Sequence, residues 1–277
     1  MALNSVNTNS GALVALQNLQ STNSELATVQ SRINTGKKVN SAKDNGAVWA
    51  IAQGQRSEVN ALGAVKDSLA RGSSAVDVSI AAGESVSDLL LQLKEKALSA
   101  TDKSLTTAAR TALNEDFKAI RDQITTVVTN AKFNGVNLLD NSTGTGGYKA
   151  LSNTAGSTIK VAGENLSLGG TNVTVATTTT IGTSTLATTA LGLVNASIDK
   201  VSASLARLGT GAKALDTHST FVGKLSDALE NGIGNLVDAD LAKESARLQS
   251  LQTKQQLGVQ ALSIANQSSS ILLGLFR

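Results

Sequence analysis

The sequence predicts a mainly α-helical protein: a long antiparallel coiled-coil or helix-bundle rod with paired terminal helices and a small β-hairpin insert. Three observations lead to this fold class. The chain of 277 residues contains no proline, so no residue of that type interrupts a long helix from within. Its aromatic residues are few (Phe 4, Trp 1, Tyr 1), which leaves Leu, Val, Ile and Ala to build thin seams between helices. Apolar residues recur at helical spacing along both halves of the chain.

The two ends of the chain are predicted to form amphipathic helices that pair with each other. Residues 1–31 carry a single charge, Glu25, and residues 255–276 carry none. An amphipathic helix without charges on its outer face is poorly supported in water, so we expect both helices to be covered in an assembly. The alternative is that both ends are disordered in a free monomer and become helical on assembly. The residues expected to serve polymerisation through these helices are Leu13, Leu16, Leu19, Leu26, Ile33, Leu248, Leu251, Leu262, Leu272 and Phe276.

Three further helical patterns lie between the ends and are expected to pack as a bundle. The first covers residues 62–97, where Gly72, Ser79 and Gly83 interrupt one a/d register, and the second covers residues 113–131. The third covers residues 194–236, with a phase slip after Leu215. The seam residues of the first pattern are Leu62, Val65, Leu69, Val76, Val86, Leu90, Leu93 and Ala97. Those of the second are Leu113, Phe117, Ile120, Ile124, Val127 and Ala131, and the third begins Val194, Ile198, Val201, Leu205, Leu208, Ala212 and Leu215.

Residues 141–190 form an insert of different composition, in which more than half of the residues are Thr, Ser or Gly. Two-fold alternation at 158–161, and at 166–168 followed by 173–175 across a Gly-Gly pair, predicts β-hairpin structure. The threonines are expected to face solvent. Exposed hydroxyls with few charges nearby are candidate O-glycan acceptors, and an undecorated loop is the alternative. These candidates are Thr171, Thr174, Thr177, Thr178, Thr179, Thr180 and Thr183.

Residues 32–52 are predicted to form a hinge between the N-terminal helix and the bundle. Gly36 would end the first helix, and Ser41 would cap the next one with Asp44 in its first turn. One interpretation is that this hinge contacts neighbouring copies of the chain, and the alternative is an ordinary surface loop. The candidate contact residues are Gly36, Lys37, Asn40, Ser41 and Asp44.

The composition also excludes several classes of function. Without cysteine there is no thiolate nucleophile or Cys-ligated zinc, and a single histidine, His218, excludes His-pair metal sites. We therefore expect no catalytic residue, no metal and no cofactor. The net charge of +3 and the scarcity of aromatic residues argue against nucleic-acid binding. No apolar run is long enough to span a membrane and no secretory signal precedes Arg32, so neither membrane insertion nor a cleaved signal peptide is expected.

Several blocks of the sequence resemble bacterial flagellin. Residues 33–47 are similar to the family's S-T-G-x-x-I-N-S-A-x-D-D-A-A pattern, and residues 133–139 to its F-N-G-x-x-L-L pattern. The resemblance covers roughly residues 1–140 and 190–277. Further matching stretches are Asn7–Ser10 near the N-terminus, and Asp238–Ala242, Gln255–Gln256, Ala265–Gln267 and the final Leu-x-Leu-Phe-Arg towards the C-terminus.

This resemblance implies a structural, non-enzymatic subunit of the helical filament of the bacterial flagellum, which serves swimming motility. A hook–filament junction protein is the alternative. The resemblance implies a coiled-coil polymerisation domain (1–40 plus 240–277) at the inner tube, a helical-bundle domain (41–140 plus 191–239) at the outer tube, and a surface-exposed insert (141–190). Its implied partners are further copies, related flagellins, the hook–filament junction protein, the filament cap, the export chaperone and the type III export gate. The implied location is the extracellular filament.

Overall fold

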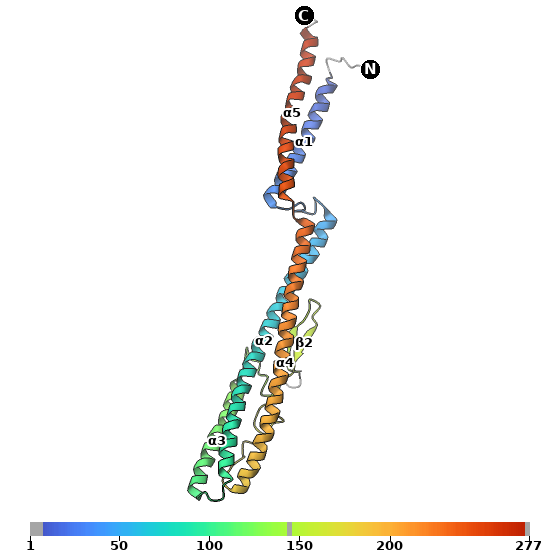
Figure 1. The fold of residues 1–277 in the computed structure, drawn as a ribbon. Helices are drawn as coiled ribbons and strands as arrows, with labels where there is room; N and C mark the ends of the chain where they lie inside the picture. The colour runs from blue at the N-terminus through green and yellow to red at the C-terminus, as the bar shows by residue number, and fades with distance from the viewer. Residues whose placement is uncertain (1–7, 143–145, 275–277) are drawn as a thin grey trace. The chain divides into compact units, whose positions relative to one another are not determined.

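The computed structural model describes residues 8–142 and 146–274, and side chains as far as Gln267. This part of the chain forms five α-helices and one two-stranded antiparallel sheet (Figure 1). The mainly α class with paired terminal helices and a small β-hairpin is therefore confirmed. Among the described residues, no helix combines the length and the apolar character that crossing a membrane requires. The elements are α1 (Ser10–Thr35), α2 (Gly46–Ala100), α3 (Thr107–Asn130), β1 (Tyr148–Leu151), β2 (Thr158–Val161), α4 (Ser184–Val237) and α5 (Leu241–Gly274).

The chain divides into two compact units. Unit 1 comprises residues 1–57 and 228–277, and unit 2 comprises residues 58–227. Unit 1 thus holds α1, α5, the first turns of α2 and the last turns of α4, whereas unit 2 holds α3, the hairpin and the longer parts of α2 and α4.

The core of unit 2 is built on the predicted helical seams. Every predicted seam residue of α2 between Leu62 and Ala97 is at most 3% exposed. On α3, Phe117 and Ile124 are fully buried, and the buried seam of α4 includes Val194 and Leu208. The heptad pattern therefore identified the buried faces of all three helices in this unit.

The glycines that interrupt these seams are contact points between elements. A Cβ on Gly72 of α2 would lie 2.9 Å from the Tyr148 ring of β1, and a Cβ on Gly83 would lie 2.7 Å from Leu205 Cδ2 of α4. Each glycine removes a side chain where a neighbour must approach the helix, so the interrupted register marks a docking position.

The predicted hairpin across Gly169 and Gly170 is wrong. The paired strands are β1 and β2, in the register Tyr148 to Val161 and Leu151 to Thr158, and β1 was not among the predicted strands. Residues 166–175 contain one isolated parallel bridge, Leu168 to Val173. The reason is that the Thr174 N–H donates to Ser197 Oγ of α4 (2.9 Å), so the segment bonds to a helix and not to a partner strand.

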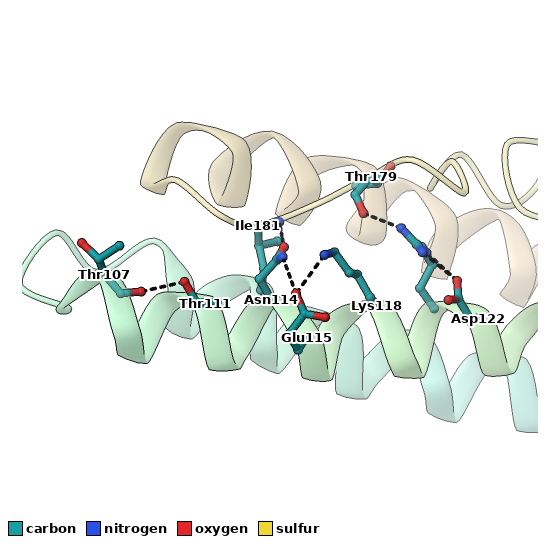
Figure 2. Close-up of polar contacts among 9 residues, drawn as sticks. Thr107, Thr111, Asn114, Glu115, Lys118, Asp122, Thr179 and Ile181 are labelled. Atoms are coloured by element: carbon teal, nitrogen blue, oxygen red, sulfur yellow. Dashed lines mark hydrogen bonds and ion pairs between the residues drawn. The ribbon is translucent and has the colours of Figure 1, made fainter.

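The insert was expected to be surface-exposed, but part of it is buried. Its apolar side chains Leu166, Val173, Val175 and Ile181 are all 0% exposed. Polar groups fix it to α3: the Ile181 N–H donates to Asn114 Oδ1 (2.8 Å), and Arg121 Nη1 donates to the Thr179 carbonyl (2.9 Å). Figure 2 shows Ile181 beside Asn114, and Thr179 facing α3 further along that helix. Hydrogen-bonded anchors of this kind let a polar, Thr-rich segment pack on helices without leaving its backbone groups unpaired.

Candidate assembly surface

The terminal helices α1 and α5 lie side by side in unit 1 and run antiparallel (Figure 1). Polar contacts cross the pair along its length: Asn9 Nδ2 donates to the Ala265 carbonyl (2.7 Å), and Gln255 Nε2 donates to Asn23 Oδ1 (2.8 Å). Asn9 also caps α1, because its Oδ1 accepts from the Ala12 N–H. Amide side chains therefore supply polar contacts between α1 and α5 where charged residues are scarce.

The seam between α1 and α5 follows an unbroken heptad spacing on each helix. Val29 of α1 and Leu251 of α5 are buried, 1% and 3% exposed, and the other seam residues are half-buried except Glu244. Gly258 lets α1 approach closely, since a Cβ there would lie 3.2 Å from Leu19 Cδ1. The positions are Ala12, Ala15, Leu19, Thr22, Leu26, Val29 and Ile33 on α1, and Glu244, Leu248, Leu251, Gln255, Gly258, Leu262 and Ala265 on α5.

Two of the residues expected to serve polymerisation lie outside this seam. Leu13 and Leu16 are 57% and 41% exposed and lie outside the seam. The true register continues through Ala12 and Ala15, whose small side chains carry a weaker apolar signal than the adjacent leucines. Six predicted residues do line the seam, namely Leu19, Leu26, Ile33, Leu248, Leu251 and Leu262. The side chain of Leu272 and all of Phe276 lie outside the described residues.

Large apolar side chains remain exposed on both terminal helices. On α1 they lie close together in sequence, and on α5 they lie between residues 257 and 264. Charged residues are absent from α1 between Ser10 and Ser24 and from α5 between Gln255 and Gln267, so these surfaces lack the groups that usually solvate a free helix. Exposed large apolar side chains on a pair of helices indicate a candidate interaction surface. The exposed residues are Leu13 (57%), Val14 (58%), Leu16 (41%), Leu257 (58%), Val259 (54%) and Ile264 (68%).

Two chain segments, 36–45 and 238–240, connect the terminal helices to α2 and α4, and we call them together the connector. Gly36 ends α1, as predicted, and its φ of 67° lies in the left-handed region. The Lys38 N–H then donates to the Val237 carbonyl (2.7 Å), and the Ala239 N–H donates to the Gly36 carbonyl (2.9 Å). These bonds tie the two segments together across a short antiparallel bridge, Lys37 to Asp238.

The predicted capping role of Ser41 is wrong. α2 begins at Gly46, and the Val48 N–H donates to Asn45 Oδ1 (3.1 Å), so Asn45 provides the cap. Asp44 instead closes a turn: its Oδ2 accepts from the backbone N–H groups of Ser41 (2.9 Å) and Asn40 (3.0 Å). The N–H groups of Ser41 and then Asn40 lower the pKa of Asp44, which keeps the turn closed with an ionised carboxylate.

A half-buried ion pair lies beside the connector. Arg32 Nη1 of α1 is 3.1 Å from Glu244 Oε1 of α5. Glu244 is 9% exposed, and its other oxygen, Oε2, is buried without a hydrogen-bond partner among the described residues. Sequence reasoning missed this pair, because each residue by itself is an ordinary helix charge.

The candidate O-glycan acceptors are not equally accessible. Thr171, Thr177 and Thr178 are exposed. Half-buried Thr174 donates its hydroxyl to the Leu193 carbonyl (3.0 Å), and half-buried Thr179 accepts from the Ala176 N–H (3.0 Å). The two remaining candidates are half-buried Thr180 and exposed Thr183, whose Oγ1 accepts from the Leu186 N–H (3.2 Å) and so caps α4.

His218 holds the hairpin turn. Its Nε2 donates to the Ser152 carbonyl (2.6 Å), and its ring lies 5.8 Å from the Phe221 ring. In the described ranges, no three His, Cys, Asp or Glu side chains gather closely enough to hold a metal ion. The histidine therefore has a structural partner within unit 2.

Comparisons with known proteins match nearly the whole chain. Residues 6–144 match the family model described as the bacterial flagellin N-terminal helical region, and residues 191–276 match the bacterial flagellin C-terminal helical region. Flagellin FljN and flagellin FljK of Caulobacter vibrioides are each 58% identical over 277 residues, which cover all of this chain and all of each relative.

A more distant relative is a flagellin of Brucella melitensis, 36% identical over 281 residues that cover 99% of both chains. A crystal structure of Bacillus cereus flagellin aligns with a TM-score of 0.37 and 18% identity, covering 66% of this chain and 94% of that chain. That structural overlap is too small to support an argument, whereas the sequence matches extend from end to end.

Proposed function

The chain belongs to the bacterial flagellin family and is a structural subunit of the flagellar filament, and we propose that its copies polymerise through the terminal helices α1 and α5. The family is structural and not enzymatic, and a hook–filament junction protein is not favoured because the close relatives are named flagellins. Flagellins form the extracellular filament, and motility and type III export follow from membership of the family.

The observation that carries the proposal is the exposed, uncharged apolar surface of the terminal pair. Leu13 of α1 and Ile264 of α5 are more than half exposed, although unit 2 buries its own seam almost completely. Burying apolar surface contributes about 25 cal/mol per Å². The pair therefore gains free energy when further copies cover it, and the exposed leucines that do not belong to the seam have a role in contacts between subunits.

The test is seeded filament growth with a variant on each terminal helix. In Leu13→Gln combined with Ile264→Gln, we expect elongation to be lost, because each exposed apolar contact becomes polar without disturbing the seam. The matched control is Leu186→Gln, which changes an exposed leucine (46%) on α4 in unit 2. Growth of the terminal variant at the rate of the unmodified chain, or equal loss in the control, would contradict polymerisation through the ends.

Limited proteolysis separates this proposal from general aggregation. Brief protease treatment of the monomer is expected to remove about 35–40 residues from each end while unit 2 stays folded, since the terminal pair has the smaller buried seam. The trimmed protein should not elongate seeds. Mass spectrometry identifies the cleavage sites, and resistance of both ends in the monomer would contradict an incomplete terminal pair.

The finer organisation extends the same proposal. Residues 1–40 and 240–277 form the inner tube of the filament, and residues 41–140 and 191–239 form the outer tube around it. Assembly of this chain with further copies and with related flagellins agrees with the several Caulobacter relatives of equal length. The filament cap, the hook–filament junction protein, the export chaperone and the type III export gate are the proposed partners during assembly.

The insert is proposed as a site of O-glycosylation at its exposed hydroxyls. Thr171, Thr177 and Thr178 support this proposal, because they are exposed and carry no side-chain hydrogen bond to another described residue that would compete. The intact mass of subunits from native filaments tests it: a mass above that of the sequence is expected, with the addition mapped to these threonines. A mass equal to that of the sequence would exclude glycosylation.

A further inference from the structure

The sequence contains three Asn-Gly pairs, and this pair is chemically labile. The backbone nitrogen of the glycine can attack the side-chain carbonyl carbon of the asparagine, because glycine carries no Cβ that hinders the approach. A C–N bond forms, the bond to the amide nitrogen breaks, and that nitrogen leaves as ammonia with the glycine N–H proton. Water then opens the cyclic succinimide to aspartate or isoaspartate. The pairs are Asn45-Gly46, Asn134-Gly135 and Asn231-Gly232.

The fold protects the pair in α4. Asn231 and Gly232 both lie within the helix Ser184–Val237, where backbone N–H groups bond to carbonyls four residues earlier. The helical backbone holds the Gly232 nitrogen away from the side-chain carbonyl carbon of Asn231. Ring closure there requires unwinding of α4, so we expect this pair to stay intact in the folded chain.

The pair at the start of α2 is partly protected. Asn45 Oδ1 accepts from the Val48 N–H (3.1 Å), which holds the carboxamide against the first turn of the helix. The Asn45 carbonyl accepts from the Trp49 N–H (3.0 Å). Ring closure at Asn45 must first break the cap, and the loss of a cap of ordinary strength should slow the reaction about fivefold.

The pair Asn134-Gly135 has neither protection. It forms a tight turn in which the backbone N–H groups of Phe133 and Val136 each donate to the carbonyl of the other residue (2.9 Å). The φ angles of Asn134 (50°) and Gly135 (81°) are both positive, a conformation that favours Asn followed by Gly. Both residues are exposed. Within the described ranges, neither the Asn134 carboxamide nor the Gly135 N–H forms a hydrogen bond.

We propose that Asn134 is a site of spontaneous deamidation, and that its isoaspartyl product weakens unit 2. In isoaspartate the main chain runs through the former side-chain carbonyl, which adds one carbon atom to the backbone. A turn lengthened in this way cannot keep both hydrogen bonds between Phe133 and Val136. The conformation of the turn therefore favours the residue pair that reacts most readily.

The segment that follows the turn is buried and makes several polar contacts. Asn137 is 0% exposed, its Nδ2 donates to the Val128 carbonyl of α3 (2.7 Å), and its Oδ1 accepts from the Leu139 N–H (2.8 Å). The Leu139 carbonyl accepts from the Leu166 N–H of the insert (2.8 Å). A longer backbone at residue 134 displaces these groups, so the isoaspartyl form should unfold at a lower temperature.

Peptide mapping of the full-length chain tests the site. The folded monomer and the chain unfolded in urea are kept in mildly alkaline buffer and digested at acidic pH. Liquid chromatography with mass spectrometry then separates aspartate from isoaspartate. In the folded chain, Asn134 should react about fivefold or more faster than Asn45, and Asn231 should keep its amide. In urea the three pairs should react at similar rates. A rate at Asn134 no higher than at Asn45 or Asn231 in the folded chain overturns the inference.

Two variants test the effect on unit 2. Asn134→Gln keeps an exposed amide but must close a larger ring, so it should resist the reaction. Ageing should lower the thermal unfolding midpoint of the unmodified chain and leave that of Asn134→Gln unchanged. The matched control Asn231→Gln should age as the unmodified chain does. Far-UV circular dichroism before ageing verifies that both variants fold. An unchanged midpoint in a chain whose Asn134 has become isoaspartate, or an equal loss in Asn134→Gln, overturns the proposed effect.

Discussion

The seam of α2 in unit 2 and the seam between α1 and α5 in unit 1 have the same heptad spacing but bury their side chains to different degrees. The predicted seam residues of α2 are at most 3% exposed, whereas on the terminal pair the buried apolar positions are Val29 and Leu251. The heptad pattern gives the spacing of the residues in a helix seam, but the number of helices and strands packed around the seam sets how deeply those residues are buried. Unit 2 is complete in one chain, and the terminal pair needs further copies.

The largest difference is expected from truncating one leucine in each region. Leu90→Ala removes a side chain that is 0% exposed and should lower the free energy of unfolding by about 2–5 kcal/mol. Leu16→Ala removes one that is 41% exposed and should change it by less than about 0.5 kcal/mol while slowing filament growth. Urea denaturation of the monomer measures both. Equal losses would show that the terminal pair is as complete as the bundle.

Adding a methyl group to a glycine of α2 probes how closely the bundle seam is packed. In Gly83→Ala the new Cβ lies 2.7 Å from Leu205 Cδ2, so we expect destabilisation of about 1–3 kcal/mol from overpacking. Gly63 lies on the same helix, and a Cβ there would meet no neighbouring side chain within 4 Å. Gly63→Ala should therefore gain about 0.5–1 kcal/mol from helix propensity. We expect thermal unfolding to show a lower midpoint for Gly83→Ala and a higher midpoint for Gly63→Ala. A higher midpoint for both variants would contradict close packing at Gly83.

The ion pair of the insert predicts how unit 2 depends on pH. Burial raises the pKa of Glu164, but the hydrogen bonds from Arg207 (2.7 and 2.6 Å), those from Ser204 and Asn172, and the Arg207 charge together outweigh burial and hold the pKa below its ordinary value. Because the pKa of Glu164 is lower in the folded chain than in the unfolded chain, ionised Glu164 stabilises the fold at pH values above its unfolded pKa. This stabilisation is lost as the pH falls through the folded pKa. Glu164→Gln should cost about 1–2 kcal/mol at neutral pH, since Arg207 remains half exposed, and should flatten this acid dependence. The control Glu84→Gln alters an exposed carboxylate and should leave the acid dependence unchanged.

The smallest effect is expected from the exposed ion pair of the terminal helices. Arg247 Nη2 lies 3.4 Å from Glu25 Oε2, and both side chains are about half exposed. Glu25→Gln should therefore change the stability of the monomer by less than about 0.5 kcal/mol, because water and salt screen such a pair. Thermal unfolding at two salt concentrations measures it. A larger, salt-sensitive loss would show that this pair and not the apolar seam holds α1 against α5.

The helical seams of unit 2, the end of α1 at Gly36 and the family could all be predicted from the sequence. Residues 62–97 could be assigned because large apolar side chains recur at most a and d positions, and Gly36 because a left-handed helix end favours glycine. These features depend on residues that are near one another in the chain, so local spacing is enough to identify them.

The remaining features required the folded chain. The α1 register runs through Ala12 and Ala15, because α5 approaches closely enough for small side chains to fill the seam. The strand partner of β2 is β1 and not the segment near Gly169, because Ser197 of α4 takes the Thr174 N–H. Arg32 finds Glu244 across more than two hundred residues. Each of these outcomes depends on which distant group bonds to an unpaired polar atom or fills a gap in the packing. The spacing of neighbouring residues does not predict such long-range contacts.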